Sequence, residues 1–173
     1  MPTARDSARR AVGMTEPEVW HLVAEQRKLQ VATLGPDGWP HLSTLFHTVL
    51  EGRLVFWTYA RSQKVRNLER DSRLTCLVEA GEEYADLRGV QIVGKAHIMR
   101  AREEIEPVGR AVVCRMLDLD PDADLDSAVA AEVTRQAGKR VAVEVQPQRW
   151  ASWDHRKLAG QGGSSGWAGQ DKP

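Results

Sequence analysis

A short segment after the third predicted strand concentrates side chains that could bind a phosphate. Arg61, Lys64 and Arg66 surround the start of a predicted helix, and Ser62 stands at its N-cap position. The first N–H groups of a helix have no partner inside the helix and attract anions. Basic side chains beside these groups add charge-assisted hydrogen bonds to a phosphate or a carboxylate. The sequence therefore predicts an anion site at this helix start.

The distribution of charge along the same helix favours this interpretation. A helix dipole prefers acidic residues in the first turn and basic residues in the last turn. Here the basic residues come first, and Glu69 and Asp71 follow at the other end. A bound anion would offset the unfavourable placement of the bases. A solvated surface helix without a ligand is the alternative, and the local sequence leaves both open.

Histidines are the candidate proton donors. His41 and His47 are separated by an even number of residues in a predicted strand, so they share one face. They could form a proton-donor pair or serve as ordinary polar strand residues, and we assign no catalytic residue. The histidines, together with Cys76 and Cys114, lack the spacing of metal ligands, so no metal site is predicted.

The composition is that of one ordinary soluble domain. The 173 residues are 42% hydrophobic and 28% charged, and 24 basic residues balance 24 acidic residues. A neutral chain argues against a nucleic-acid or membrane-surface partner. No apolar run reaches the ~18 residues of a membrane span, and no secretory signal follows the basic N-terminus. We therefore expect a cytoplasmic protein.

Six short β-runs separated by turn residues follow an N-terminal helix. Thr15 with Glu18 forms a capping box at the start of that helix. Gly35–Gly38 and Glu51–Gly52 join successive strands as hairpins. Strands are predicted at residues 29–34, 41–50, 53–59, 74–80, 90–100 and 139–146, with later helices at 62–70, 101–117 and 124–137.

This order of elements predicts a mainly β protein, a small six-stranded antiparallel barrel with peripheral helices. Residues 1–14 have no apolar periodicity, and the segment after residue 158 is rich in glycine and serine. We interpret residues 1–14 as a flexible arm, 15–158 as the folded domain and 159–173 as a flexible tail.

Several segments, in this order, resemble the pyridoxamine-phosphate-oxidase-like split β-barrel superfamily. They are residues 31–43 (VATLGPDGWPHLS), 53–58 (RLVFWT), 64–71 (KVRNLERD) and 74–78 (LTCLV). The end of the chain, residues 145–157 (VQPQRWASWDHRK), resembles the flavin/deazaflavin oxidoreductase branch of this superfamily. The resemblance covers about residues 18–158.

The resemblance implies a homodimer with a cofactor in each of two clefts between the barrels. In this family the second strand flanks the flavin ring, and the third strand with the following loop and helix holds the ribityl and phosphate groups. C-terminal tryptophans approach the cleft or its dimer wall. The matching residues here are Ser43, Thr44, Leu45, Trp57, Thr58, Arg61, Ser62, Lys64, Arg66, Asn67, Trp150 and Trp153.

Two cofactors fit the resemblance, the deazaflavin coenzyme F420 and FMN. F420 carries an acidic oligoglutamate tail, for which Arg66, Arg70 and Arg73 are candidate partners. Arginine outnumbers lysine 18 to 6, as in GC-rich actinobacterial genomes, and actinobacteria make F420. We therefore expect an F420-dependent oxidoreductase that transfers a hydride to or from a small unsaturated substrate. The alternatives are an FMN-dependent enzyme and a non-catalytic protein that binds flavin, deazaflavin or haem.

Overall fold

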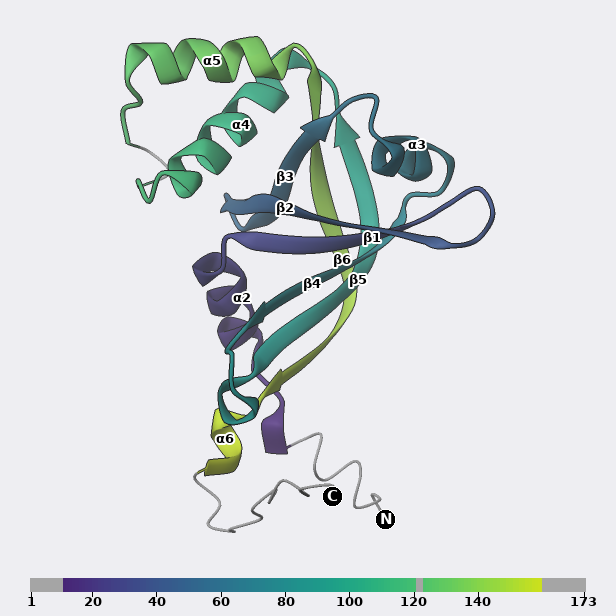
Figure 1. The fold of residues 1–173 in the computed structure, drawn as a ribbon, viewed down its shortest axis with the longest axis vertical. Coiled ribbons are helices and arrows are strands. Elements are labelled where there is room, and N and C mark those ends of the chain that lie inside the picture. The colour runs from purple at the N-terminus through teal and green to yellow at the C-terminus, as the bar shows by residue number, and fades with distance from the viewer. Residues whose placement is uncertain (1–10, 121–122, 160–173) are drawn as a thin grey trace, which may run out of the picture.

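The computed structural model describes residues 11–120 and 123–159, which form six strands with helices around them (Figure 1). The strands are β1 (Lys28–Leu34), β2 (Pro40–Leu50), β3 (Arg53–Tyr59), β4 (Arg73–Ala80), β5 (Arg88–Met99) and β6 (Arg140–Asp154). The helices are α2 (Glu16–Glu25), α3 (Gln63–Arg70), the 3₁₀ turn η1 (Tyr84–Asp86), α4 (Arg102–Met116), α5 (Ser127–Ala137) and α6 (Arg156–Ala159).

The six strands form a closed antiparallel barrel in the order β1-β2-β3-β6-β5-β4, which confirms the predicted architecture. Alternate residues of each strand point inward, and the interior is filled by fully buried side chains such as Leu29, Leu54 and Phe56. Two-residue hairpins require positive φ angles. Glu51 and Gly52 adopt them, at 50° and 75°, where β2 turns into β3.

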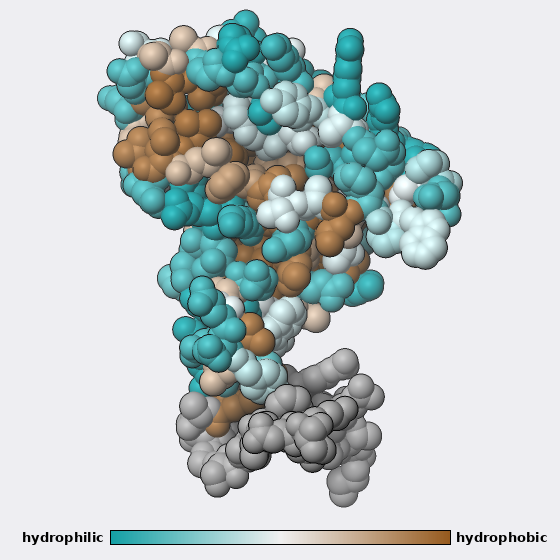
Figure 2. Space-filling model, viewed as in Figure 1, coloured by the Kyte–Doolittle hydropathy of each residue, from teal (hydrophilic) through white to brown (hydrophobic). Residues whose placement is uncertain are grey.

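A second core lies outside the barrel, beneath α4 and α5. It joins Val55 and Trp57 of β3 to Val108 and Val112 of α4. The Trp57 ring occupies the space above Gly109, where an added Cβ atom would come within 2.4 Å of the indole. Helix packing here therefore depends on the absence of a side chain at Gly109. Hydrophobic surface gathers over α4 and α5 and again over the strands (Figure 2).

β2 and β3 pair over only part of their lengths. Their ladder runs from His47 to Leu50 of β2, whereas the earlier residues of β2 pair with β1 alone. The last residues of β3, Trp57–Tyr59, pair only with β6. The two strands therefore part beyond His47, and in the part of the chain that the structure describes no strand fills the gap.

β6 is longer than predicted. The sequence pattern indicated an end at Gln146, but the strand continues to Asp154 along the whole of β5. Pro147 and a loss of alternation hide this continuation. The β5–β6 pairing shifts register opposite Val93 and Gly94, where it skips Gln148 of β6. Gly94 is required there, because an added Cβ would lie 2.3 Å from the carbonyl oxygen of Gln146.

The two ends of the domain are tied together near α6. The Met14 N–H donates to Ser152 Oγ at 3.0 Å, and Lys157 Nζ donates to the Gly13 carbonyl at 2.8 Å. Gly13 and Met14, which the sequence assigned to the arm, thus contact the folded domain. The rest of the arm before residue 11, and the tail after residue 159, lie outside the described residues. No described helix is long and apolar enough to span a bilayer.

His47 should make the free energy of unfolding depend on pH. Its side chain is fully buried, its Nε2 lies 2.9 Å from the Val23 carbonyl oxygen, and its Nδ1 has no partner among the described residues. Burial is the main cause that lowers its pKa from 6.5 to about 4. Between these values the unfolded chain binds a proton that the folded chain does not, so stability falls as the pH drops through this window.

The loss should approach ~3 kcal/mol at pH 4, on top of the contributions of other groups. Urea unfolding between pH 7.5 and 4.5 measures it, and His47→Gln should flatten this part of the profile. His97→Gln, at an exposed position, is the matched control. An unchanged pH profile in His47→Gln would contradict the assignment.

Candidate functional site

Helix α3 is fixed to the barrel by a buried polar contact. Asn67 is fully buried, and its amide nitrogen donates to Thr33 Oγ1 of β1 at 3.0 Å. Gln63 Nε2 in turn donates to Asn67 Oδ1 at 2.9 Å. Asn67, which the resemblance matched to a cofactor ligand, therefore has its amide engaged within the chain. Its contacts set the position of the helix start.

Lys64 is a half-buried cation with no acidic partner among the described residues. Its Nζ donates to the hydroxyl oxygen of Thr58, the buried residue near the end of β3, at 3.3 Å. Burial lowers the pKa of Lys64 from its usual value. A desolvated ammonium bound only to a neutral hydroxyl is well suited to bind an anion.

Ser62 leaves its hydroxyl group free at the start of α3. It is the N-cap residue, but its side chain makes no capping hydrogen bond, and its Oγ is buried without a partner. The first intrahelical bond runs from the N–H of Arg66 to the Ser62 carbonyl. The preceding N–H groups of the first turn are thus available, and no acidic residue lies in that turn.

The arginines around α3 differ in their freedom to bind a ligand. Arg70 donates to the Leu34 carbonyl, and Arg73 forms a bidentate pair with Asp71, with a shortest distance of 2.6 Å. Both are thus held by contacts within the chain. Arg61 and Arg66 are exposed and make no ion pair with any residue that the structure describes.

The free edge of β2 lies in the gap between β2 and β3. The N–H of His47 bonds toward the β1 side, to the Arg27 carbonyl. Backbone groups alternate along an antiparallel strand, so those of Thr44 and Phe46 point away from β1, toward the gap. Ser43 pairs with Val31 on the inner face, and its Oγ is buried without a partner. Leu45 packs against the barrel core.

Within one chain, the residues around Lys64 at the start of α3 lie apart from Trp57 and from the C-terminal tryptophans. The Trp57 indole is packed in the core beneath α4. Trp153 lies over Gly89 of β5. Arg73, which follows α3, pairs with Lys95 of β5, six residues further along that strand. At ~3.3 Å per residue this is roughly 20 Å. Trp150 pairs with Ile92 on the same half of β6, and α3 and α6 stand at opposite ends of the molecule (Figure 1).

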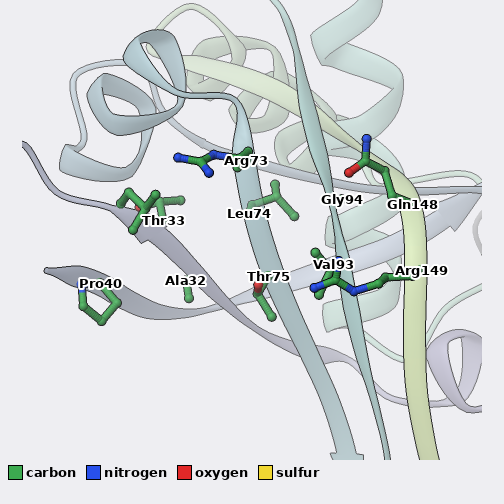
Figure 3. A pocket seen from close by; sticks show the side chains of 11 residues that line it. Ala32, Thr33, Pro40, Arg73, Leu74, Thr75, Val93, Gly94, Gln148 and Arg149 are labelled. Carbon is green, nitrogen blue, oxygen red and sulfur yellow. The ribbon is translucent and has the colours of Figure 1, made fainter. Parts of the chain in front are cut away.

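A shallow hollow of about 400 Å³ opens on the outer face of the sheet (Figure 3). Ala32, Thr75 and Val93 form its floor, and the Arg149 side chain extends from β6 across β5 toward Thr75. Arg73, on its rim, is paired with Asp71. None of its lining residues belongs to α3, so the hollow is distinct from the anion site proposed at Ser62 and Lys64.

The histidines differ in burial and in hydrogen-bond partners. His47 is enclosed beneath α2, while His41 is half-buried with its Nδ1 unpartnered among the described residues. The His155 ring contacts the carbonyl oxygen of Tyr84. The burial of His47 argues against a His41–His47 proton-donor pair. No three histidine, cysteine or acidic side chains gather in metal-binding geometry within residues 11–120 and 123–159.

The sequence interpretation missed Arg140 and Tyr59. The Arg140 guanidinium lies over the rings of Trp57 and Tyr59, at 4.5 and 4.2 Å from their centroids. The alternation of Trp57 and Tyr59 indicated a shared strand face, but only the register of β3 and β6 reveals that Arg140 faces them.

Comparison with known proteins agrees with the fold. A family described as pyridoxamine 5'-phosphate oxidase matches residues 15–154. None of the curated proteins matches the chain. The structure of a conserved hypothetical protein from Mycobacterium tuberculosis, Rv2991, is 35% identical, with 92% of this chain and 96% of that chain covered and a TM-score of 0.80.

Two further structures share the fold at lower identity. An F420 reductase is 20% identical, covering 75% of this chain and 93% of its own, with a TM-score of 0.55. The haem storage protein HutZ from Vibrio cholerae is 16% identical, covering 78% and 90%, with a TM-score of 0.58. The match over most of the sequence and the six-stranded barrel lead to one conclusion: the chain belongs to the pyridoxamine 5'-phosphate oxidase family of split β-barrels.

Proposed function

We propose that this protein is a coenzyme F420-dependent oxidoreductase that transfers a hydride between the deazaflavin and a small unsaturated organic substrate. The observation that carries the proposal is the half-buried Lys64 ammonium, which lacks an acidic partner among the described residues and lies at the free start of α3. This cation site adjoins the gap where β2 and β3 part. The two cysteines of the protein are free and buried, which suits the reducing cytoplasm, where we propose that the protein acts.

The residues around the gap fit a ribityl phosphate joined to a flat ring. Lys64 and Ser62, together with the N–H groups of the first turn of α3, would hold the phosphate. The buried, unpartnered hydroxyl groups of Ser62 and Ser43 offer hydrogen bonds that the described chain does not use. Backbone groups of Thr44 and Phe46 would bind the edge of the ring. The cofactor, when bound, supplies the hydride chemistry, and the protein supplies position and exclusion of water.

The cofactor choice rests on the cations beyond the phosphate site. Arg61 and Arg66 are exposed and unpaired among the described residues, so they are available to the acidic tail of F420. The engagement of Arg70 and Arg73 removes two of the three arginines that the sequence offered for the tail. FMN shares the phosphate and the ring, and it is the alternative cofactor.

The site requires a second copy of the chain if Trp150 or Trp153 borders the cofactor, because one chain keeps Trp153 roughly 20 Å away from the end of α3. A surface with few charged side chains and no covering helix is available for such pairing. Two cross-strand rows on the outer face of the sheet contain one charged side chain, Arg149: the first is Leu42, Ala32, Thr75, Val93 and Arg149, and the second is Thr44, Gln30, Leu77, Gln91 and Ala151.

Leu42 is 67% exposed on this face, and the Oε1 of Gln30 is buried without a partner among the described residues. The helices pack elsewhere: α4 on β2, β3 and β6, and α3 on β1 near its end. Packing one such face on another would bury Leu42 and cover the hollow of Figure 3. We therefore propose a homodimer with cofactor sites between the two barrels.

Lys64→Ala should weaken cofactor binding without unfolding the barrel. The loss of a charge-assisted contact with phosphate is worth ~1.5–3 kcal/mol, or roughly a 10- to 150-fold increase in Kd. The effect should be equal for F420 and FMN, whereas Arg66→Ala should weaken F420 more. Titration by tryptophan fluorescence quenching measures both.

Arg102→Ala, on an exposed position of α4 where Arg102 pairs with Glu106, is the control and should bind both cofactors like the wild type. Urea unfolding without cofactor should give nearly equal stability for Lys64→Ala and the wild type. If the wild type binds F420 or FMN and Lys64→Ala binds it equally well, the phosphate is held elsewhere.

Sedimentation should give about twice the chain mass of 19.3 kDa at micromolar concentration. Val93→Arg places a second positive charge beside Arg149 on this face and should convert the protein to a monomer that no longer binds cofactor. Leu117→Glu, at a residue 52% exposed at the end of α4, should remain dimeric. A monomeric wild type that binds cofactor would overturn the proposed arrangement.

A further inference from the structure

Arg140, at the start of β6, is clamped between two aromatic rings. Its guanidinium carbon lies 4.5 Å from the centroid of Trp57 and 4.2 Å from that of Tyr59, within the range of cation–π attraction. Tyr59 is its direct cross-strand partner on β3. These three residues form what we call the Arg140 clamp. Contact with both rings restricts the motion of the guanidinium and reduces the entropy lost when it binds a ligand.

The clamped guanidinium has no acceptor among the residues that the structure describes. Its Nε is buried without a hydrogen-bond partner, and burial lowers the pKa of Arg140. Buried donors are nearly always paired in native proteins. The nearby Arg135, in contrast, is already bound to Glu132, with a shortest distance of 2.5 Å. The Arg140 guanidinium therefore has donor groups that no described residue uses.

The clamp lies at the same end of β3 as the phosphate site, on the opposite face of the strand, because Thr58 points to one face and Trp57 and Tyr59 to the other. Thr58, which holds Lys64 Nζ, precedes Tyr59 in the strand, and Arg61 follows two residues later. Tyr59 is 52% exposed, so solvent reaches the clamp. Arg61 is exposed and unpaired among the described residues, which adds a second cation nearby. A ligand anchored at Lys64 reaches Arg140 only around the end of β3, so the group that binds there has to be carried on a flexible part of the ligand.

We propose that the Arg140 clamp is a second oxyanion-binding site, which takes a carboxylate or phosphate group of the bound cofactor. This proposal rests on the proposed function for the identity of the ligand, although not for the presence of the anion site. The competing account is a purely structural role, in which the guanidinium joins β3 to β6 and binds nothing.

The anion site is tested first without any cofactor. Arginine Nε–H signals are recorded by NMR while pyrophosphate is added to the wild-type protein, and Arg140→Lys identifies the Arg140 signal by its loss. We expect a saturable shift of this signal at millimolar pyrophosphate. The signal of Arg135, whose guanidinium is already paired, should move much less. An Arg140 signal that does not move overturns the proposal, whatever the cofactor.

The source of the oxyanion is tested by affinity. Dissociation constants are measured for F420 with its glutamate tail, for F420 without glutamates and for FMN. Arg140→Gln should weaken tailed F420 by roughly ten- to a hundredfold. If tailless F420 and FMN then bind within twofold of wild type, the ligand is a tail carboxylate. An equal loss for all three assigns the ribityl phosphate.

Two further variants separate binding from folding. Tyr59→Leu removes one ring of the clamp and retains the charge, so it should give a smaller loss than Arg140→Gln. Arg135→Gln is the matched control and should bind all three ligands like the wild type. If Arg140→Gln does not fold, Arg140→Lys and Tyr59→Leu provide the comparison, because each retains a positive charge at residue 140.

The failure of each proposal gives a different result. One possible result is that the wild type binds neither F420 nor FMN, although its Arg140 signal shifts with pyrophosphate. The anion site then stands, but the proposed function is wrong and the cofactor is not the ligand of the site. If the wild type binds a cofactor and every Arg140 variant binds it with the same affinity, the clamp is not a cofactor contact. The proposed function then still stands.

Discussion

The rest of the structure depends on the limited pairing of β2 with β3. A closed barrel normally satisfies the backbone groups of every strand, but here the ladder stops at His47 and the first half of β2 has a free edge. Helix α3 begins beside the end of β3, with its first N–H groups and Lys64 unneutralised by any acidic residue in its first turn. A free strand edge and a cationic helix start thus occur together, because β3 leads directly into α3.

The position of α3 in turn depends on contacts that bind no ligand. Asn67 and Thr33 join the helix to β1 within the barrel, and Val65 and Leu68 fill the core beneath it. On the other face of β3, Gly109 admits Trp57, and Trp57 supports Arg140. The cations around the end of β3 are therefore held by a rigid interior on both sides, as expected for a site that orients a cofactor.

The barrel and the cation cluster could be predicted from sequence because both are encoded locally. Alternating strands, hairpin glycines and a helix that begins with basic residues each occupy a short window. The Arg140 clamp depends on the β3–β6 register, which joins residues far apart in the chain. The engagement of Arg70 by a carbonyl, the burial of Asn67 and the extension of β6 to Asp154 likewise arise only from tertiary packing.

A crystal structure of the full chain grown with coenzyme F420 tests the central claim most directly. Our account predicts the ribityl phosphate at the start of α3, within hydrogen-bond distance of Lys64 Nζ and Ser62 Oγ, with the ring against the free edge of β2. A phosphate bound away from α3, or a ring outside the gap between β2 and β3, would contradict it.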